Sequence, residues 1–201
     1  MKNKLLTLAG VLGLTFQAAA LPIGTATLGG GAVQVLPPLV SPLVPDVNDL
    51  AHQLNGSLES RAYRNDSSNP FGLSGITFWY QLTMSSIVPS GDNANRLSLN
   101  GYLGFLVNAA YVAATGVAPD GYTFFADTVG FNISLAAGQQ SAILLVRTSA
   151  TGVKVALEKV QDGGQSDTFG FAPAVPDGGT TVVLLGGALT GLGLLRKKFL
   201  A

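Results

Sequence analysis

Two uncharged apolar segments at the ends of this 201-residue chain limit what it can fold into, because each is joined to a cluster of cations. Near the N-terminus, Lys2 and Lys4 precede the uncharged residues 5–16. Near the C-terminus, the uncharged residues 180–195 precede three cations, Arg196, Lys197 and Lys198. A water-soluble folded domain must therefore come from the residues between the two segments.

The N-terminal segment has the order of a secretory signal peptide, with a charged start, an apolar run and small residues before a cleavage site. The small residues are Ala18 and Ala20, spaced as in an A-x-A site. The apolar run 5–16 is too short to span a bilayer comfortably. We expect the secretion machinery to export the chain and residues 1–20 to be removed after Ala20. The alternatives are a retained anchor or a buried N-terminal helix.

The C-terminal segment predicts a transmembrane helix over residues 180–195. Its sixteen uncharged residues rise about 24 Å as a helix, which is less than the roughly 30 Å hydrocarbon core. The cations after it can extend to the interface and, by the positive-inside rule, keep this end in the cytoplasm. Lys2 and Lys4 do the same at the other end, so the residues between face outward. Gly187 and Gly191 have a G-x-x-x-G spacing, for which contact with another helix is an alternative use.

A short motif stands just before the predicted helix, and it consists of Val175, Pro176, Asp177, Gly178 and Gly179. Pro176 cannot continue a helix backward, and the two glycines favour an extended, accessible backbone at the membrane face. A membrane protease needs such a segment. The alternative is a plain helix start, with Asp177 as the anion at the helix N-terminus.

The motif, the helix and the basic cluster, in this order, resemble the PEP-CTERM class of sorting signals in its VPDSG-type variant, with Gly178 in the place of the usual serine. The resemblance covers residues 175–201. It implies that an exosortase-like membrane enzyme cuts near the motif and releases the domain or transfers it to the cell surface. Pro176 and Asp177 would then be recognised residues, and the chemistry would belong to the partner enzyme.

The residues between the two ends predict an all-β fold. Residues 21–53 hold five of the ten prolines and are expected to form an extended Pro/Gly-rich leader. From residue 54 the hydrophobic pattern has a period of two, which places Ile76, Phe78, Tyr80, Leu82 and Met84 on one face of a strand. We expect strands in residues 56–64, 75–86, 96–112, 122–135, 141–149, 152–160 and 167–172, and one antiparallel β-sandwich or jelly-roll-like domain over residues 54–174. This stretch also resembles, more loosely, the β-rich passengers that often carry such sorting signals, a resemblance that implies no activity.

Composition excludes several functions for the passenger. The chain has no cysteine, which rules out disulfides, thiol chemistry and haem attachment through cysteine. Residues 21–176 contain six basic and ten acidic side chains, a net charge of −4, so nucleic acid is not an expected partner.

Candidate catalytic and metal-binding residues form no familiar pattern. His52 is the single histidine, and with Asp46 and Asp49 it could in principle form a zinc site or part of a serine-hydrolase triad, but a solvated helical face fits better. Glycosidase chemistry would need two facing carboxylates from Glu59, Asp120, Asp127 and Glu158. Calcium or turn positions are Asp92, Asp162 and Asp167, without a complete calcium loop. We predict no enzyme, no metal and no cofactor.

Trp79 is the one candidate for ligand contact, because an outward-facing indole can stack on the sugar rings of an extracellular polysaccharide. Packing in the core is the alternative. The sequence thus predicts an exported cell-envelope or matrix protein that is a membrane-anchored intermediate before it reaches the cell surface. The alternatives are a secreted hydrolase or lectin-like domain, and a surface protein that stays anchored in the membrane.

Overall fold

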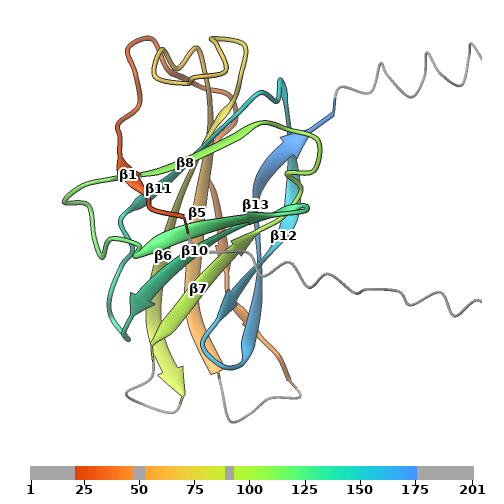
Figure 1. Ribbon diagram of the computed structural model, residues 1–201. Helices are drawn as coiled ribbons and strands as arrows, with labels where there is room; N and C mark the ends of the chain where they lie inside the picture. The colour runs from red at the N-terminus through yellow and green to blue at the C-terminus, as the bar shows by residue number, and fades with distance from the viewer. Residues whose placement is uncertain (1–20, 48–52, 89–92, 176–201) are drawn as a thin grey trace, which may run out of the picture.

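The computed structural model describes residues 21–47, 53–88 and 93–175, and within these ranges every regular element is a β-strand (Figure 1). The strands are β1 (Gly24–Thr25), β2 (Val33–Gln34), β3 (Leu39–Pro42), β4 (Val44–Pro45), β5 (Gln53–Arg64), β6 (Thr77–Val88), β7 (Ala94–Leu99), β8 (Val107–Val112), β9 (Gly121–Phe125), β10 (Thr128–Leu135), β11 (Ile143–Thr148), β12 (Gly152–Gln161) and β13 (Gln165–Ala174).

The strands form two sheets. The seven-stranded sheet has the order β1-β8-β11-β6-β5-β2, with β3 also paired to β5, and the six-stranded sheet has the order β4-β13-β12-β7-β10-β9. Neighbouring strands are antiparallel except for β1 and β8, which run parallel. The predicted all-β class is therefore confirmed.

One hydrophobic core lies between the sheets, as between the layers of a sandwich. The alternation predicted for β6 is confirmed, because the core contains Ile76, Phe78, Tyr80, Leu82 and Met84. Leu97 and Phe131 reach the same core from the six-stranded sheet. Each such side chain contributes roughly 1.5–3 kcal/mol of burial free energy, so this domain can be stable without disulfides.

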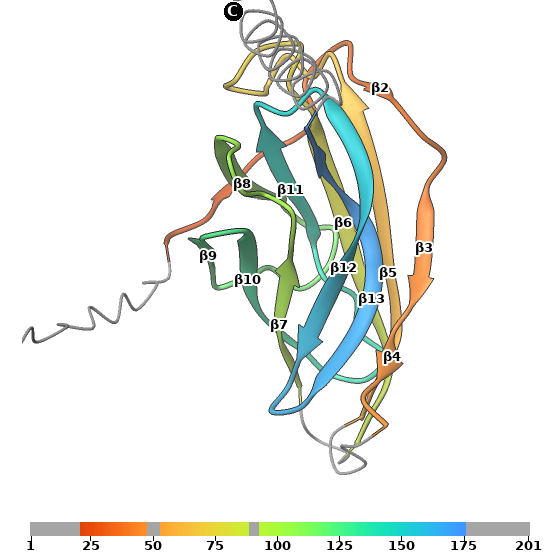
Figure 2. The same ribbon diagram turned by 90° about the vertical axis from the view of Figure 1, so that its right-hand side faces the viewer.

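The boundary predicted at residue 54 does not separate a leader from the domain, because residues 21–47 form part of both sheets. Within them, β1, β2 and β3 add to the seven-stranded sheet and β4 adds to the six-stranded sheet. Leu43, between β3 and β4, is buried in the common core where the chain passes from one sheet to the other. Figure 2 shows these two strands running down one edge of the molecule. Proline is tolerated at such edges, where an N–H donor is not needed.

The predicted signal peptide (residues 1–20) and transmembrane helix (residues 180–195) lie outside the described residues. Within the described ranges there is no helix with the length and apolar character needed to cross a membrane.

Candidate functional site

The sequence Val-Pro-Asp occurs twice, and the structure places its first copy in a sheet. Val44 pairs with Asp167 and Pro45 pairs with Ser166 as β4 adds to β13. The N–H of Asp46 donates a hydrogen bond of 3.2 Å to the carbonyl of Gln165. The backbone of this first copy is therefore held in the sheet and is not presented as a free extended strand.

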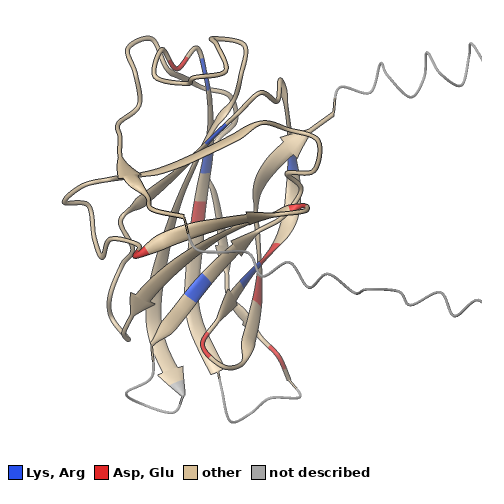
Figure 3. Cartoon of the chain, viewed as in Figure 1, with Lys and Arg blue, Asp and Glu red and all other residues tan. Residues whose placement is uncertain are grey.

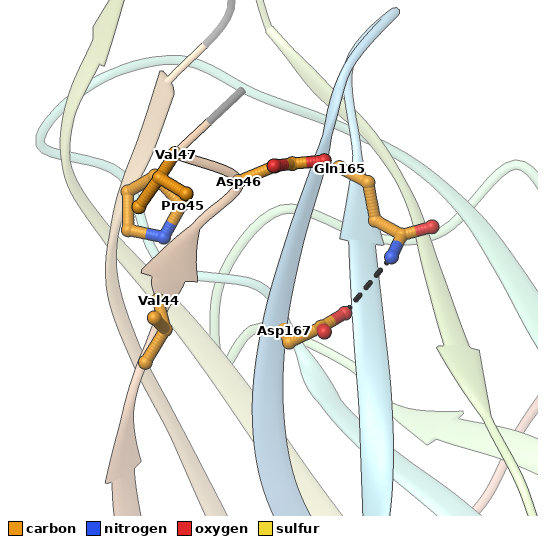
Figure 4. Close-up of a pocket in the computed structure, with 6 residues that line it drawn as sticks. All are labelled: Val44, Pro45, Asp46, Val47, Gln165 and Asp167. Carbon is orange, nitrogen blue, oxygen red and sulfur yellow. Dashed lines mark hydrogen bonds between the residues drawn. The ribbon is translucent and has the colours of Figure 1, made fainter. Parts of the chain in front are cut away.

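The first copy also lines a pocket of about 320 Å³ together with Val47, Gln165 and Asp167 (Figure 4). The Gln165 amide donates a 2.9 Å hydrogen bond to Asp167, and the Lys159 ammonium lies 4.0 Å from the same carboxylate. The polar groups of the pocket thus bond to neighbours. No cluster of three metal-binding side chains occurs here or elsewhere in the described part of the chain.

The second copy follows the last strand of the domain directly. β13 ends at Ala174, and the side chain of Val175 is 69% exposed. The rest of the predicted motif, Pro176, Asp177, Gly178 and Gly179, lies outside the described residues, as do the signal-cleavage residues and the basic cluster of residues 196–198. The start of the motif is therefore at the domain surface.

Comparison with known families identifies this C-terminal segment as a sorting signal. The family model for the VPDSG-CTERM motif matches residues 174–199, in agreement with a PEP-CTERM-type signal. The resemblance deduced from the sequence is thereby confirmed. No curated protein and no solved structure matches the chain significantly.

The end of the domain from which the signal emerges, here called the exit end, is built from the loops that follow β5, β7 and β11. Arg64 at the end of β5 donates to the carbonyl of Thr151 at 3.1 Å, and the N–H of Leu106 donates to the Ser149 hydroxyl at 3.1 Å. Gly152 pairs with Ala174, the last residue of β13. The exposed apolar side chains of these loops are Leu73, Leu103 and Leu106.

The four carboxylates considered for glycosidase chemistry do not form an open pair. Glu59 bonds to Arg61 at 2.8 Å, and Asp127 accepts the N–H of Leu103 at 2.8 Å. Asp120 is exposed, whereas Glu158 is fully buried. The chain thus places Glu158 in its core, Glu59 and Asp127 in separate hydrogen bonds, and Asp120 on the surface.

Glu158 is the most perturbed of these groups. Burial raises its pKa to about 8, a hydrogen bond from the N–H of Asn100 opposes the rise, and the charges of Asp127 and Lys154 act in opposite directions. Its Oε2 accepts that N–H at 2.5 Å, and its Oε1 has no hydrogen-bond partner. A carboxyl enclosed in this way has no access to a substrate in solution.

Of the remaining residues considered as metal ligands, Asp162 lies within the described part of the chain. Asp162 accepts the N–H of Gly164 at 2.9 Å in the turn between β12 and β13, as expected for turn chemistry. Asp49, His52 and Asp92 lie outside the described residues.

Trp79 is only 8% exposed and lies on the outer face of the seven-stranded sheet with Ala110 and Leu145. The Arg61 guanidinium lies over the ring, 4.8 Å from its centroid. The faces of the indole are covered, so the geometry favours the packing alternative over sugar stacking.

Proposed function

We propose that this is an exported envelope or extracellular-matrix protein whose C-terminal signal is processed by an exosortase-like membrane enzyme, and whose β-domain has a structural or polysaccharide-binding role without catalysis. The observation that carries the proposal is the VPDSG-CTERM match at residues 174–199, which begins at the last residue of the final strand. In this proposal the C-terminal signal directs sorting, and the folded β-domain is the part that is delivered.

The geometry of the exit end is consistent with a membrane-anchored intermediate. Four residues lie between Val175 and the start of the predicted helix at Thr180, so the two positions are at most about 17 Å apart when the chain is extended. A helix in the bilayer would hold the exit end close to the membrane surface. Leu73, Leu103 and Leu106 are exposed there, and leucine side chains are favourable at a membrane interface.

A non-catalytic role is supported by the positions of the carboxylates. None of the four acids considered for hydrolysis has a second carboxylate beside it at an open cleft among the described residues. The hydrolase alternative therefore gains no support from the geometry.

The two Val-Pro-Asp copies provide a matched test of the sorting role. Pro176→Ala and Asp177→Ala are expected to leave an unprocessed, membrane-associated protein in the producing cell, because the recognised segment is changed. Pro45→Ala and Asp46→Ala change the same residue types in a copy that is held in the sheet, and they are expected to behave as wild type. Cell fractionation followed by immunoblotting measures both. Normal delivery of the two tail variants to the cell surface would contradict the proposal.

A further inference from the structure

The outer face of the six-stranded sheet carries a cation with no carboxylate partner. Arg96 is the single charged residue of β7, seen as the blue band on that strand in Figure 3. Its guanidinium donates to three neutral oxygen atoms, at Ser98 (3.2 Å), Asn132 (3.0 Å) and Thr123 (2.7 Å). No ion pair of Arg96 occurs within the described part of the chain. Two of its five N–H donors are left for a ligand.

A glycine in the neighbouring strand β10 leaves the space that the guanidinium occupies. A Cβ atom at Gly130 would overlap Nη2 of Arg96, so the side chain lies across β10 only because residue 130 is glycine. Three hydrogen bonds and the close contact with Gly130 hold the Arg96 guanidinium against the sheet. This lowers the entropy cost of binding an anion. Arginine presents paired donors that match the two oxygens of a carboxylate.

The neighbours of Arg96 extend the site across five strands. The other members of the row of paired residues through Arg96 are uncharged: Gln165, Gln161, Asn132 and Gly121. The next row includes Lys159, whose nearest acid is Asp167. Two strand positions further along, Leu157 and Phe169 face each other across β12 and β13, 42% and 50% exposed. We call this surface the outer platform.

We propose that the outer platform binds a carboxylate-bearing polysaccharide, with Arg96 pairing with a uronate carboxylate and Phe169 stacking on a sugar ring further along the same polymer. The platform is longer than a single small anion, and its amides can bond to sugar hydroxyls. An exposed aromatic ring beside polar groups is a suitable surface for the C–H face of a sugar. This inference rests on the polysaccharide-binding role proposed for the domain and names its ligand class and its residues.

The test is the binding of the full chain, in neutral detergent, to immobilised alginate and to neutral dextran of similar length. We expect alginate to bind more tightly, with an affinity that falls as salt rises, because the contact is partly ionic. Arg96→Gln is expected to weaken alginate binding about tenfold, the value of one charge-assisted hydrogen bond. Arg64→Gln removes a cation from the exit end and serves as the control that retains binding.

A second variant, at an exposed position, keeps the test informative if Arg96→Gln disturbs the fold of the sheet. Phe169→Ala changes an exposed ring and is expected to weaken binding to both polymers. Salt-insensitive binding that Arg96→Gln and Phe169→Ala leave unchanged would overturn this inference, while the polysaccharide-binding role would stand. A protein that binds neither alginate nor dextran would overturn both this inference and the polysaccharide-binding role. Neither outcome would affect the sorting role, which the tail variants test separately.

Discussion

Asp66→Ala is expected to lower the free energy of unfolding by about 3 kcal/mol or more. Asp66 is fully buried, and its Oδ1 accepts hydrogen bonds from the N–H of Gly29 (2.7 Å) and from the N–H (2.9 Å) and hydroxyl (2.6 Å) of Ser68. Its Oδ2 accepts the Thr77 hydroxyl at 2.6 Å and lies 3.8 Å from Nε of Arg147. Removing the carboxylate takes away the acceptor of these donors. It also leaves the buried guanidinium without its counter-charge, with hydrogen bonds only to uncharged oxygens.

Urea denaturation followed by the fluorescence of Trp79 measures this loss. Asp120→Ala removes an exposed carboxylate and is expected to change stability by no more than about 0.5 kcal/mol. If Asp66→Ala were equally mild, the network that attaches residues 27–29 to the loop after β5 would not be a major source of stability.

The same network predicts an acid limit. Burial alone would raise the pKa of Asp66, but hydrogen bonds from Ser68, from Thr77 and from the backbone N–H groups of Gly29 and Ser68 outweigh it, so the pKa lies below the ordinary value of 3.8. The ionised form is therefore favoured by folding. Its contribution is present above pH 3.8 and is lost as the pH falls through the folded pKa.

Glu158 is expected to give the opposite dependence at higher pH. Its folded pKa of about 8 lies above the ordinary value of 4.5, so the protonated form is favoured by folding. The contribution is fully present below pH 4.5 and is lost as the pH rises through about 8. Stability should fall between pH 5 and pH 8 by up to about 1.4 kcal/mol per pH unit.

The groups that act on Glu158 come from several elements. Asp127 raises its pKa, Lys154 lowers it, and the hydroxyls of Tyr80 and Tyr102, which lie 2.6 Å apart in the core, have pKa values raised by burial and by the charge of Glu158. The tyrosines are neutral throughout this pH range. The expected slope therefore follows chiefly from the proton of Glu158.

Denaturation midpoints measured from pH 5 to pH 8 test this expectation. Glu158→Gln carries no proton to lose and is expected to remove the slope. Glu59→Gln, on the outer sheet face, should retain it. His52 is present in all three proteins, so any contribution from it cancels from the comparison. A wild-type stability that is constant or rises over this range would contradict the account of Glu158.

The sequence predicted the strand faces well where alternation was uninterrupted, as in β6. It was less informative where one run of residues formed two strands. Residues 96–112 read as one strand, yet the chain turns through Gly101 and Gly104, both with positive φ (90° and 85°), and β7 and β8 join different sheets. Residues 122–135 contain a hairpin at Ala126, whose φ of 51° is unusual for a residue other than glycine.

Long-range contacts explain what the sequence could not predict. The site at Arg96 depends on the register of β7 with β10 and of β10 with β9, which places Ser98, Asn132 and Thr123 around one guanidinium. No local pattern marks this residue. The edge strands of residues 21–47 were likewise not predictable from the sequence, because proline is common both in linkers and at sheet edges.

The intact mass of the mature protein, recovered from the surface of the producing cell, tests the central claim most directly. Export and sorting predict a chain that lacks residues 1–20 and the segment after about Asp177, while Pro176→Ala and Asp177→Ala keep that segment. A wild-type mass that still includes residues 196–201 would make the tail a permanent anchor and would contradict processing by an exosortase-like enzyme.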